Sequence, residues 1–332
     1  MTIFWTFAAF AFALGAVVGS FLNVVIYRVP AGKSVVTPGS HCPICGHAIR
    51  WYDNVPILSW ALLLRARCRD CAAPIPARYA LVETLTGLLT LALWFKIGWR
   101  HFQDIDLFNE LAVSTLAVPF GFYFFFICLL VVVTFVDLDH YLIPHEFTFP
   151  GMAIGIAAAF ALSSEHIMAP GSMGGFWPPV TPSVSIIGLL VGGLTVVVIF
   201  VLYYAIRGAE GIGGGDVTLM AVMGAWLGWP SLVFIFFAAS FQGVIAAGIG
   251  HLMGGRFLKH SAEIIAEHDA AFGGEAEVVA VGEPGEQEEQ GELVGGMAVP
   301  FGPFIALAGL EYFFLGEFLP AELTMSYIYG IW

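Results

Sequence analysis

The sequence predicts an all-α polytopic membrane protein with about eight transmembrane helices and a small polar module between the first two. Three observations support this prediction: a high apolar content, a series of uncharged runs, and four cysteines arranged as two C-x-x-C pairs. Hydrophobic residues make up 59% of the 332-residue chain and charged residues 11%, with a mean hydropathy of +0.86. This composition excludes a soluble globular protein, and the chain lacks the basic stripe that is typical of a nucleic-acid-binding protein.

The expected membrane helices are apolar stretches long enough to cross a bilayer, which takes about 20 residues. The first, residues 1–27, has no basic segment before its apolar run, so we interpret it as an uncleaved helix. Its Gly15, Gly19 and Ser20 suit close packing against another helix. The other expected helices are residues 81–99, 111–136, 147–164, 184–206, 216–229, 231–254 and 298–318.

The basic residues predict the orientation of these helices. Seven of the twelve lysines and arginines lie in residues 28–82, and the positive-inside rule therefore makes this module cytoplasmic. If the chain crosses the membrane eight times from this cytoplasmic module, only Lys96 and Arg100 of the twelve lysines and arginines lie on the outer side. The loops that share the cytoplasmic side with the module are residues 137–146, 207–215 and 255–297.

Five regions follow from this pattern: a first transmembrane helix, a four-cysteine module, a membrane core, an acidic cytoplasmic loop, and a last helix with the C-terminus. Their expected limits are residues 1–27, 28–82, 83–254, 255–297 and 298–332. Residues 256–295 contain ten acidic residues against Arg256 and Lys259, and they carry much of the formal net charge of −13. Such an acidic, glycine-rich segment is expected to be a flexible loop.

Two aspartates are predicted at the ends of membrane helices on one side of the membrane. Asp216 closes the stretch GIGGGD, residues 211–216, and begins an apolar run, while Asp137 directly follows the run 111–136. Acids near lipid are costly and are functional-site candidates by default. Both lie on the cytoplasmic side of the expected topology.

A pair of carboxyl groups held close together shares a proton, because both cannot ionise cheaply. One carboxylate can then activate water while the other group donates a proton to a scissile peptide bond. Helix dipoles favour the anion at a helix N-terminus, which suggests Asp216 as the base and Asp137 as the proton donor. Asp139 is the substitute if Asp137 is not the catalytic acid.

Asp137 and Asp216 also allow other interpretations. Both acids can be boundary residues that face water or headgroups, as in an assembly scaffold. An ion-coupled transporter is disfavoured because its acids lie near the membrane midplane. A nucleotide-binding loop is disfavoured because GIGGGD follows a membrane helix and lacks the Lys-Ser/Thr pair of a phosphate loop.

The four paired cysteines predict a structural zinc site. The ligands are Cys42, Cys45, Cys68 and Cys71, in two C-x-x-C pairs with 22 residues between them. A module this small has little core of its own, so a metal would supply stability. A pair of disulfides is the alternative, which a cytoplasmic location disfavours. Cys128, inside an apolar run, is expected to be a small buried hydrophobic residue.

Several long motifs resemble those of one family, the bifunctional type IV prepilin leader peptidases with N-methyltransferase activity. The motifs are GSFLNVVIYRVP at 19–30, CPICGHAIRWYDNVPILSW at 42–60, RCRDC at 67–71, RYALVE at 78–83, FVDLDHYLIP at 135–144, GIGGGD at 211–216, GAWLGW at 224–229 and PFGPFIALAG at 300–309. They cover most of the chain in the family's order.

The resemblance implies that Asp137 and Asp216 are the catalytic pair of a membrane aspartyl peptidase. The implied reaction is removal of a basic leader from type IV prepilins or type II secretion pseudopilins at the cytoplasmic boundary of the bacterial inner membrane. N-methylation of the new N-terminus with S-adenosylmethionine would follow, and a peptidase without methyltransferase activity is the alternative. The sequence assigns no residues to the methyl donor, although Arg50, Trp51 and Glu83 are candidates for shaping that site or the path of the leader, together with Tyr52.

The chain departs from the family pattern at three positions. His145 replaces an Asp or Asn, and Thr218 replaces a Lys, which leaves both catalytic carboxyl groups in place. Ala66 replaces the glycine of an Arg-Gly-Arg-Cys run, so any backbone feature that requires glycine is altered in the part linked to methylation.

Overall fold

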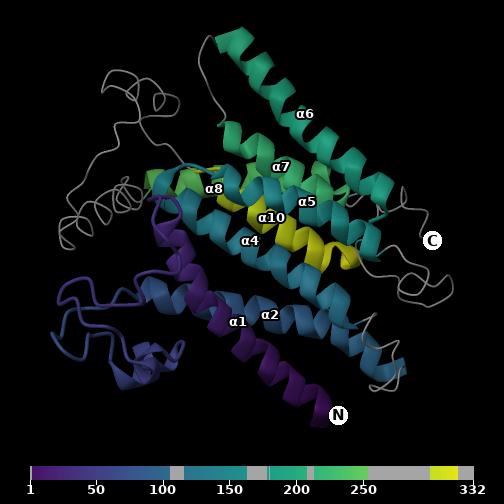
Figure 1. Cartoon of the computed structure of the whole chain (residues 1–332). Helices are drawn as coiled ribbons and strands as arrows, with labels where there is room; N and C mark the ends of the chain where they lie inside the picture. Colours follow the sequence, from purple (N-terminus) through teal and green to yellow (C-terminus); the bar gives the residue numbers. More distant parts are fainter. Residues whose placement is uncertain are drawn as a thin grey trace. The chain divides into compact units, whose positions relative to one another are not determined.

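A computed structural model of the chain describes residues 2–104, 116–162, 178, 180–207, 213–252 and 300–320 (Figure 1). Some parts of the sequence-based predictions lie outside these residues. They are residues 111–115 of the expected third helix, the acidic loop 255–297, Gly211 and Ile212 of the glycine-rich stretch, and the chain beyond residue 320.

Within the described residues, a helix forms in each of the expected membrane segments. They are α1 (Thr2–Arg28), α2 (Ala77–Asp104), α4 (Val118–His140), α5 (His145–Leu162), α6 (Pro182–Arg207), α7 (Gly214–Leu227), α8 (Ser231–Leu252) and α10 (Gly302–Leu315). Three short turns, η1 (Trp51–Asn54), η2 (Ser59–Leu63) and η4 (Gly316–Phe318), complete the helical elements. Across the described ranges, β-structure is limited to the bridges His41–Ala48 and Arg67–Pro74. The prediction of an all-α protein is confirmed.

Six of these helices are long and apolar enough to cross a membrane: α1, α2, α4, α5, α6 and α8. Helices α7 and α10 have only 14 residues each. At 1.5 Å per residue such a helix is about 21 Å long, shorter than a hydrocarbon core of about 30 Å. A multi-spanning architecture is therefore supported, while the expected count of eight spans is not confirmed.

The chain divides into two compact units, and the boundary falls inside α4 between Val132 and Val133. The first unit contains α1, the four-cysteine module, α2 and the first part of α4. The second contains the end of α4 and the helices α5, α6, α7, α8 and α10. Each expected site therefore lies within a single unit.

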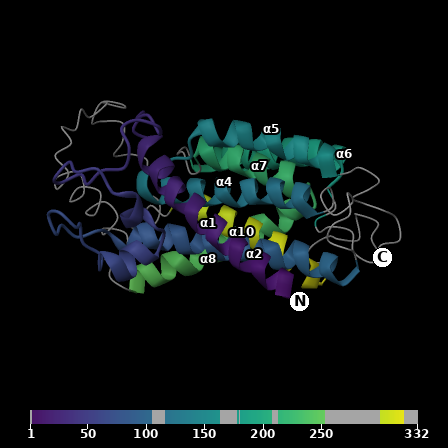
Figure 2. The ribbon, with the colours of Figure 1, turned by 60° about the horizontal axis from the view of Figure 1, so that its bottom comes forward.

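In the first unit, α1 and α2 pack closely along small residues, as the sequence predicts (Figure 2). A Cβ at Gly15 would lie 2.7 Å from the Thr86 carbonyl oxygen, and one at Gly19 would lie 2.9 Å from the Glu83 Cα. The buried side chain of Asn23 donates to the Tyr79 carbonyl across the same interface at 3.1 Å. Glycine is thus required for the backbones to approach.

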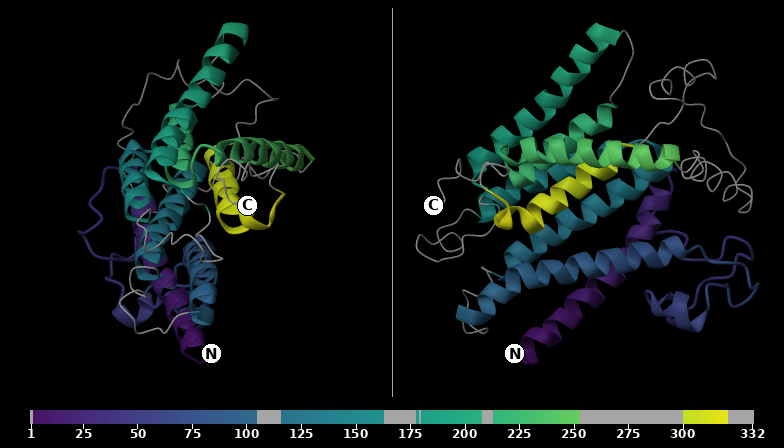
Figure 3. Two further views of the ribbon diagram at one scale, coloured as in Figure 1. Left: turned by 90° about the vertical axis from the view of Figure 1, so that its right-hand side faces the viewer. Right: turned by 180° about the vertical axis from the view of Figure 1, so that it is seen from behind.

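In the second unit, α7 is surrounded by other helices, which explains a short helix that is apolar on every side. Residues 219–227 are all buried. Gly188 of α6 and Gly224 of α7 touch directly, and Ser185 donates to the Ala225 carbonyl at 2.7 Å. On another side, the Trp226 indole donates to the Gly151 carbonyl of α5 at 2.8 Å. Figure 3 shows α6 alongside α7 in both of its views.

Candidate active site

Asp137 lies in the last turn of α4, with only 5% of its surface exposed. Its helix continues to His140 and ends at Tyr141, which adopts a left-handed conformation with φ of 53°. The Oδ2 atom of Asp137 accepts a hydrogen bond of 3.0 Å from the backbone N–H of Gly302, the first residue of α10. Two helices that are distant in the sequence therefore fix this carboxyl group.

Asp216 lies in the first turn of α7, as the sequence predicts. Gly213 precedes the helix in an extended conformation, and its carbonyl accepts a hydrogen bond of 3.1 Å from the Asp216 N–H. The side chain is partly buried. Asp216 and Asp137 are near enough for their charges to interact. The two expected carboxyl groups are thus brought together within the second unit.

Ile143 fills the junction between the elements that carry the two acids. A Cβ at Gly215, next to Asp216, would lie 2.7 Å from the Cβ of Ile143. A Cβ at Gly302 would lie 2.6 Å from Asp137 Oδ2 and 2.9 Å from the Cδ1 of Ile143. Glycine at these two positions therefore lets α7 and α10 approach the end of α4 closely enough to set both carboxyl groups.

The sequence-based analysis did not assign a role to Gly302 or Tyr141. Gly302 belongs to the motif at 300–309, so the signal was present, but the distance in sequence gave no reason to place it beside Asp137. Tyr141 is 44% exposed, and its pKa is raised by partial burial and by the nearby negative charge of Asp137. Its neutral hydroxyl borders the site. Asp139, the expected substitute for Asp137 as the catalytic acid, lies on the same turn of α4 as Asp137 and is partly exposed.

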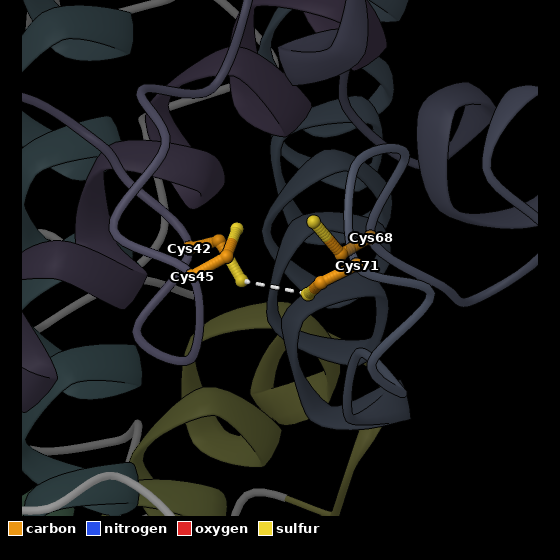
Figure 4. A group of neighbouring side chains, drawn as sticks. All are labelled: Cys42, Cys45, Cys68 and Cys71. Atoms are coloured by element: carbon orange, nitrogen blue, oxygen red, sulfur yellow. Dashed lines mark hydrogen bonds between the residues drawn. The ribbon is translucent and has the colours of Figure 1, made fainter.

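The four cysteines of the first unit form one cluster (Figure 4). The Sγ atoms of Cys42, Cys45, Cys68 and Cys71 all lie within 4.8 Å of one another, and the sulfur atoms of Cys42 and Cys71 are 3.8 Å apart. Tetrahedral Zn–S bonds of about 2.3 Å separate sulfur atoms by about 3.8 Å. All four thiols are free, so the disulfide alternative is not formed. The donor set fits a zinc ion. Cys128, partly buried in α4, is not part of the cluster.

The two cysteine loops have the same backbone hydrogen bonds. In the first, Cys42 N–H donates to the His47 carbonyl, Gly46 N–H to Cys42, and Ile49 N–H to Ser40. The second repeats this pattern at the same spacings, from Cys68 to Ala73, from Ala72 to Cys68 and from Ile75 to Ala66. Burial acts to raise the pKa of the Cys42 thiol, but N–H groups of Cys45 and Ile44 outweigh it and lower that pKa to about 7. The two loops therefore present their cysteines in the same local backbone geometry.

A polar network joins the two cysteine loops independently of the sulfur atoms. Arg69, between Cys68 and Cys71, donates to both carboxylate oxygens of the buried Asp53, at 2.8 and 2.5 Å. The guanidinium of Arg69 holds the pKa of Asp53 below its usual value. Arg50 forms an ion pair of 3.6 Å with Asp70, and its guanidinium donates to the Tyr52 hydroxyl. Arg50 and Tyr52 therefore have structural partners inside the module, while Trp51 is 83% exposed.

Two models of known families match this chain. A bacterial peptidase A24 N-terminal domain matches residues 13–97, and a type IV leader peptidase family matches residues 124–248. A relative from Myxococcus xanthus (strain DK1622), named prepilin leader peptidase/N-methyltransferase, is 35% identical over 96% of this chain and 94% of its own. The chain belongs to the type IV leader peptidase family.

Further members of the family carry the same name as the Myxococcus protein. One from Dichelobacter nodosus is 34% identical over 71% of this chain and 81% of its own length. One from Aeromonas hydrophila is 34% identical over 75% of this chain and 82% of its own. No solved structure matches this leader peptidase. The A24 N-terminal domain contains the four cysteines, and the leader peptidase region contains both aspartates.

Proposed function

We propose that this protein is an aspartyl endopeptidase of the bacterial inner membrane, which removes the basic leader from prepilins or type II secretion pseudopilins and then N-methylates the new N-terminus. The observation that carries the proposal is the junction of α4, α7 and α10, where Asp137 and Asp216 interact. The relatives named prepilin leader peptidase/N-methyltransferase support the same two activities.

The aspartate pair supplies what hydrolysis of a peptide bond requires. One carboxylate accepts a proton from water as the water oxygen attacks the scissile carbonyl carbon, and the other carboxyl group gives its proton to the carbonyl oxygen. The proton taken from water then passes to the amide nitrogen, and collapse of the tetrahedral intermediate breaks the C–N bond, which releases the leader and a new amine. Both carboxyl groups lie next to ends of apolar helices, so the reaction would occur at the membrane boundary.

The hydrogen bond from Gly302 bears on which aspartate acts as the base. The sequence-based assignment of Asp216 as the base considered the dipoles of α4 and α7 alone. A backbone N–H at the start of α10 now contributes at Asp137, and such a donor bonds most strongly to an ionised carboxylate. We therefore assign Asp137 as the carboxylate that holds the water, and Asp216 as the group that carries the proton.

The four-cysteine module is proposed to support methylation. Zinc held by Cys42, Cys45, Cys68 and Cys71 would cross-link its two loops and would have a structural role, because four thiolates fill a tetrahedral shell. S-adenosylmethionine, when bound, supplies an electrophilic methyl group on a sulfonium. The new N-terminal amine, after losing a proton, would take up that methyl group.

The cytoplasmic orientation of both sites rests on the charge of the loops. Arg28 ends α1, and Arg65 and Arg67 lie in the polar module between α1 and α2. By the positive-inside rule, this side faces the cytoplasm. Alternation of the helices then gives the aspartate junction the same side.

Processing of a prepilin by the full-length protein in detergent tests this function. Asp137→Asn and Asp216→Asn are each expected to reduce the rate of cleavage about 10³-fold, since each removes a group that transfers a proton. Asp139→Asn, on the same turn, is the matched control and should cleave within about twofold of wild type. Mass spectrometry of the product gives both the cleavage site and the added methyl group. Undiminished cleavage by either of the first two variants would exclude that residue from catalysis.

A further inference from the structure

One turn of the four-cysteine module exposes a cluster of leucines that the proposed chemistry does not use. We define this apolar turn as residues 57–64, which contain η2. Leu58, Leu62 and Leu63 are exposed at 52%, 68% and 54%. They lie four and five residues apart, and the bond from Leu64 N–H to the Ser59 carbonyl gives the turn a wide, π-type geometry. The three leucines therefore share one face.

The opposite face of the apolar turn is anchored in the module. Ser59 is buried, accepts a hydrogen bond from the Val55 N–H at 2.9 Å, and donates to the Tyr52 carbonyl. The Trp60 indole donates to the Ile75 carbonyl at 2.9 Å. The turn is thus fixed with its polar contacts inward and its leucines outward. Clustered exposed leucines on a fixed turn indicate an interaction surface.

Glu83 sets the depth of this turn relative to the membrane helices. Its buried carboxylate accepts a hydrogen bond of 2.7 Å from the Ile57 N–H, and the Ser20 hydroxyl of α1 also bonds to it. Ile57 is a β-branched residue with φ of 63°, a conformation that such residues avoid, so the contact holds it there. Figure 3 shows the module beside the first turns of α2 in its right-hand view.

Glu83 lies six residues after Ala77, the first residue of α2, which places it about 9 Å along the helix axis. The stretch Ala77–Trp99 of α2 is long and apolar enough to cross the membrane. The headgroup layer on each side of a bilayer is only about 5–8 Å thick. Glu83 therefore lies near the end of this apolar stretch, and the Ile57 N–H that is bonded to it lies at the level where α2 would enter the membrane.

Basic residues follow the apolar turn directly. Arg65 and Arg67 are both exposed. Segments that lie in a membrane interface typically combine leucines with arginines. Their apolar side chains enter the acyl boundary, and their guanidinium groups lie among anionic headgroups. We propose that the apolar turn of the module rests in the anionic lipid surface, with Leu58, Leu62 and Leu63 inserted and Arg65 and Arg67 on the lipid phosphates.

Photocrosslinking of the full-length protein in vesicles of phosphatidylcholine and phosphatidylglycerol tests this proposal. A photoreactive p-benzoylphenylalanine replaces Leu62 in one variant and Ile44 in another. Ile44 is 51% exposed and apolar, but it lies in the first cysteine loop. Mass spectrometry should find lipid adducts at position 62 at least about tenfold more often than at position 44, as expected for burial in the acyl boundary.

Two results would overturn the proposal. Equal labelling at both positions would show that the apolar turn lies no closer to lipid than the cysteine loop, and adducts with added prepilin in place of lipid would assign the turn to substrate binding. Each labelled variant must still bind zinc and methylate an already cleaved prepilin, which shows that the module is folded, and position 63 replaces position 62 if it does not. In addition, the double variant Arg65→Gln/Arg67→Gln should lose any preference for phosphatidylglycerol over phosphatidylcholine in the lipid adducts. A preference that persists would exclude these arginines from lipid binding.

Discussion

The two candidate sites of this leader peptidase are built in opposite ways. The four-cysteine module draws its cysteines from two short loops, residues 40–49 and 66–75, and the Asp53–Arg69 pair connects the second loop to the turn that follows the first. The aspartate junction draws Asp137 and its donor Gly302 from positions 165 residues apart, and apolar helices hold them. The first site therefore consists of two short loops whose thiols could hold a metal ion, whereas the packing of helices positions the second.

This difference predicts that the two activities can be separated. Because no described residue of the aspartate junction belongs to the cysteine module, damage to one site should leave the other intact. Substitutions in each site test that separation.

The largest effect is expected from loss of a cysteine ligand. Cys68→Ser removes one of four thiolates, and structural zinc sites do not hold their fold without the metal. We expect the bound zinc to fall from one equivalent to near zero by elemental analysis, and methylation to be lost, while prepilin cleavage stays within about threefold of wild type. Cys128→Ser, outside the cluster, is the control and should keep its zinc. Loss of cleavage together with zinc would show that the module supports both sites.

A smaller effect is expected from Gly302→Ala in the aspartate junction. The added methyl group would lie 2.6 Å from Asp137 Oδ2, so the carboxyl group or the start of α10 must move. A displaced catalytic group reduces the rate by about 10²-fold, and we expect the loss in kcat, with a changed pH profile of cleavage and unchanged methylation of an already cleaved substrate.

Gly309→Ala is the matched control for Gly302, because it lies in the same helix. Its added methyl group would meet the flexible side chain of Met223 and leave the aspartates untouched. Its pH profile should be that of wild type. Equal effects of the two substitutions would mean that Gly302 acts only through the packing of α10.

The smallest effect is expected at equivalent positions of the two cysteine loops. Gly46 and Ala72 both have positive φ, 69° and 57°, and the alanine carries a steric cost there. Ala72→Gly should strengthen zinc binding by about 1 kcal/mol, which is about fivefold in affinity. Gly46→Ala, where a Cβ would meet nothing within 4 Å, should weaken it by a similar factor.

Competition with a chelator measures both changes in zinc affinity. Shifts in opposite directions would establish the equivalence of the two loops, whereas two shifts of the same sign would refute it. Ala66, which replaces the family glycine, also has positive φ, at 59°. Ala66→Gly should therefore relieve strain in the same way.

The sequence predicted local features of these sites better than their assembly. The cysteine spacing identified the four residues whose thiols cluster, because the loops that present them are short and self-contained. The small residues Gly15 and Gly19 predicted that the first helix packs closely against another helix, but not that this helix is α2. Apolar runs located the described membrane helices but not their ends, since α4 continues past its uncharged run to His140 and includes Asp137 in its final turn.

Long-range contacts could not be predicted in the same way. Nothing in the motif at 300–309 indicates that the N–H of Gly302 bonds to Asp137, because helix packing brings them together from distant parts of the chain. The hydrogen bond that Glu83 accepts from the Ile57 N–H could not be predicted either, since Ile57 lies in an irregular loop. The number of membrane spans could not be predicted from apolar runs either. A helix such as α7 is apolar because other helices bury it, and its sequence resembles that of a helix in contact with lipid.

The most direct test of two separate sites is a mixing experiment in vesicles with one prepilin substrate. Asp137→Asn should leave the leader intact, and Cys68→Ser should cleave it without adding a methyl group. When the two variants are reconstituted together, we expect the second protein to cleave and the first to methylate, so that mass spectrometry finds the mature, N-methylated product. In the same vesicles, wild type should yield the methylated form. If the mixture then yields only unmethylated product, the claim that the two sites act independently is contradicted.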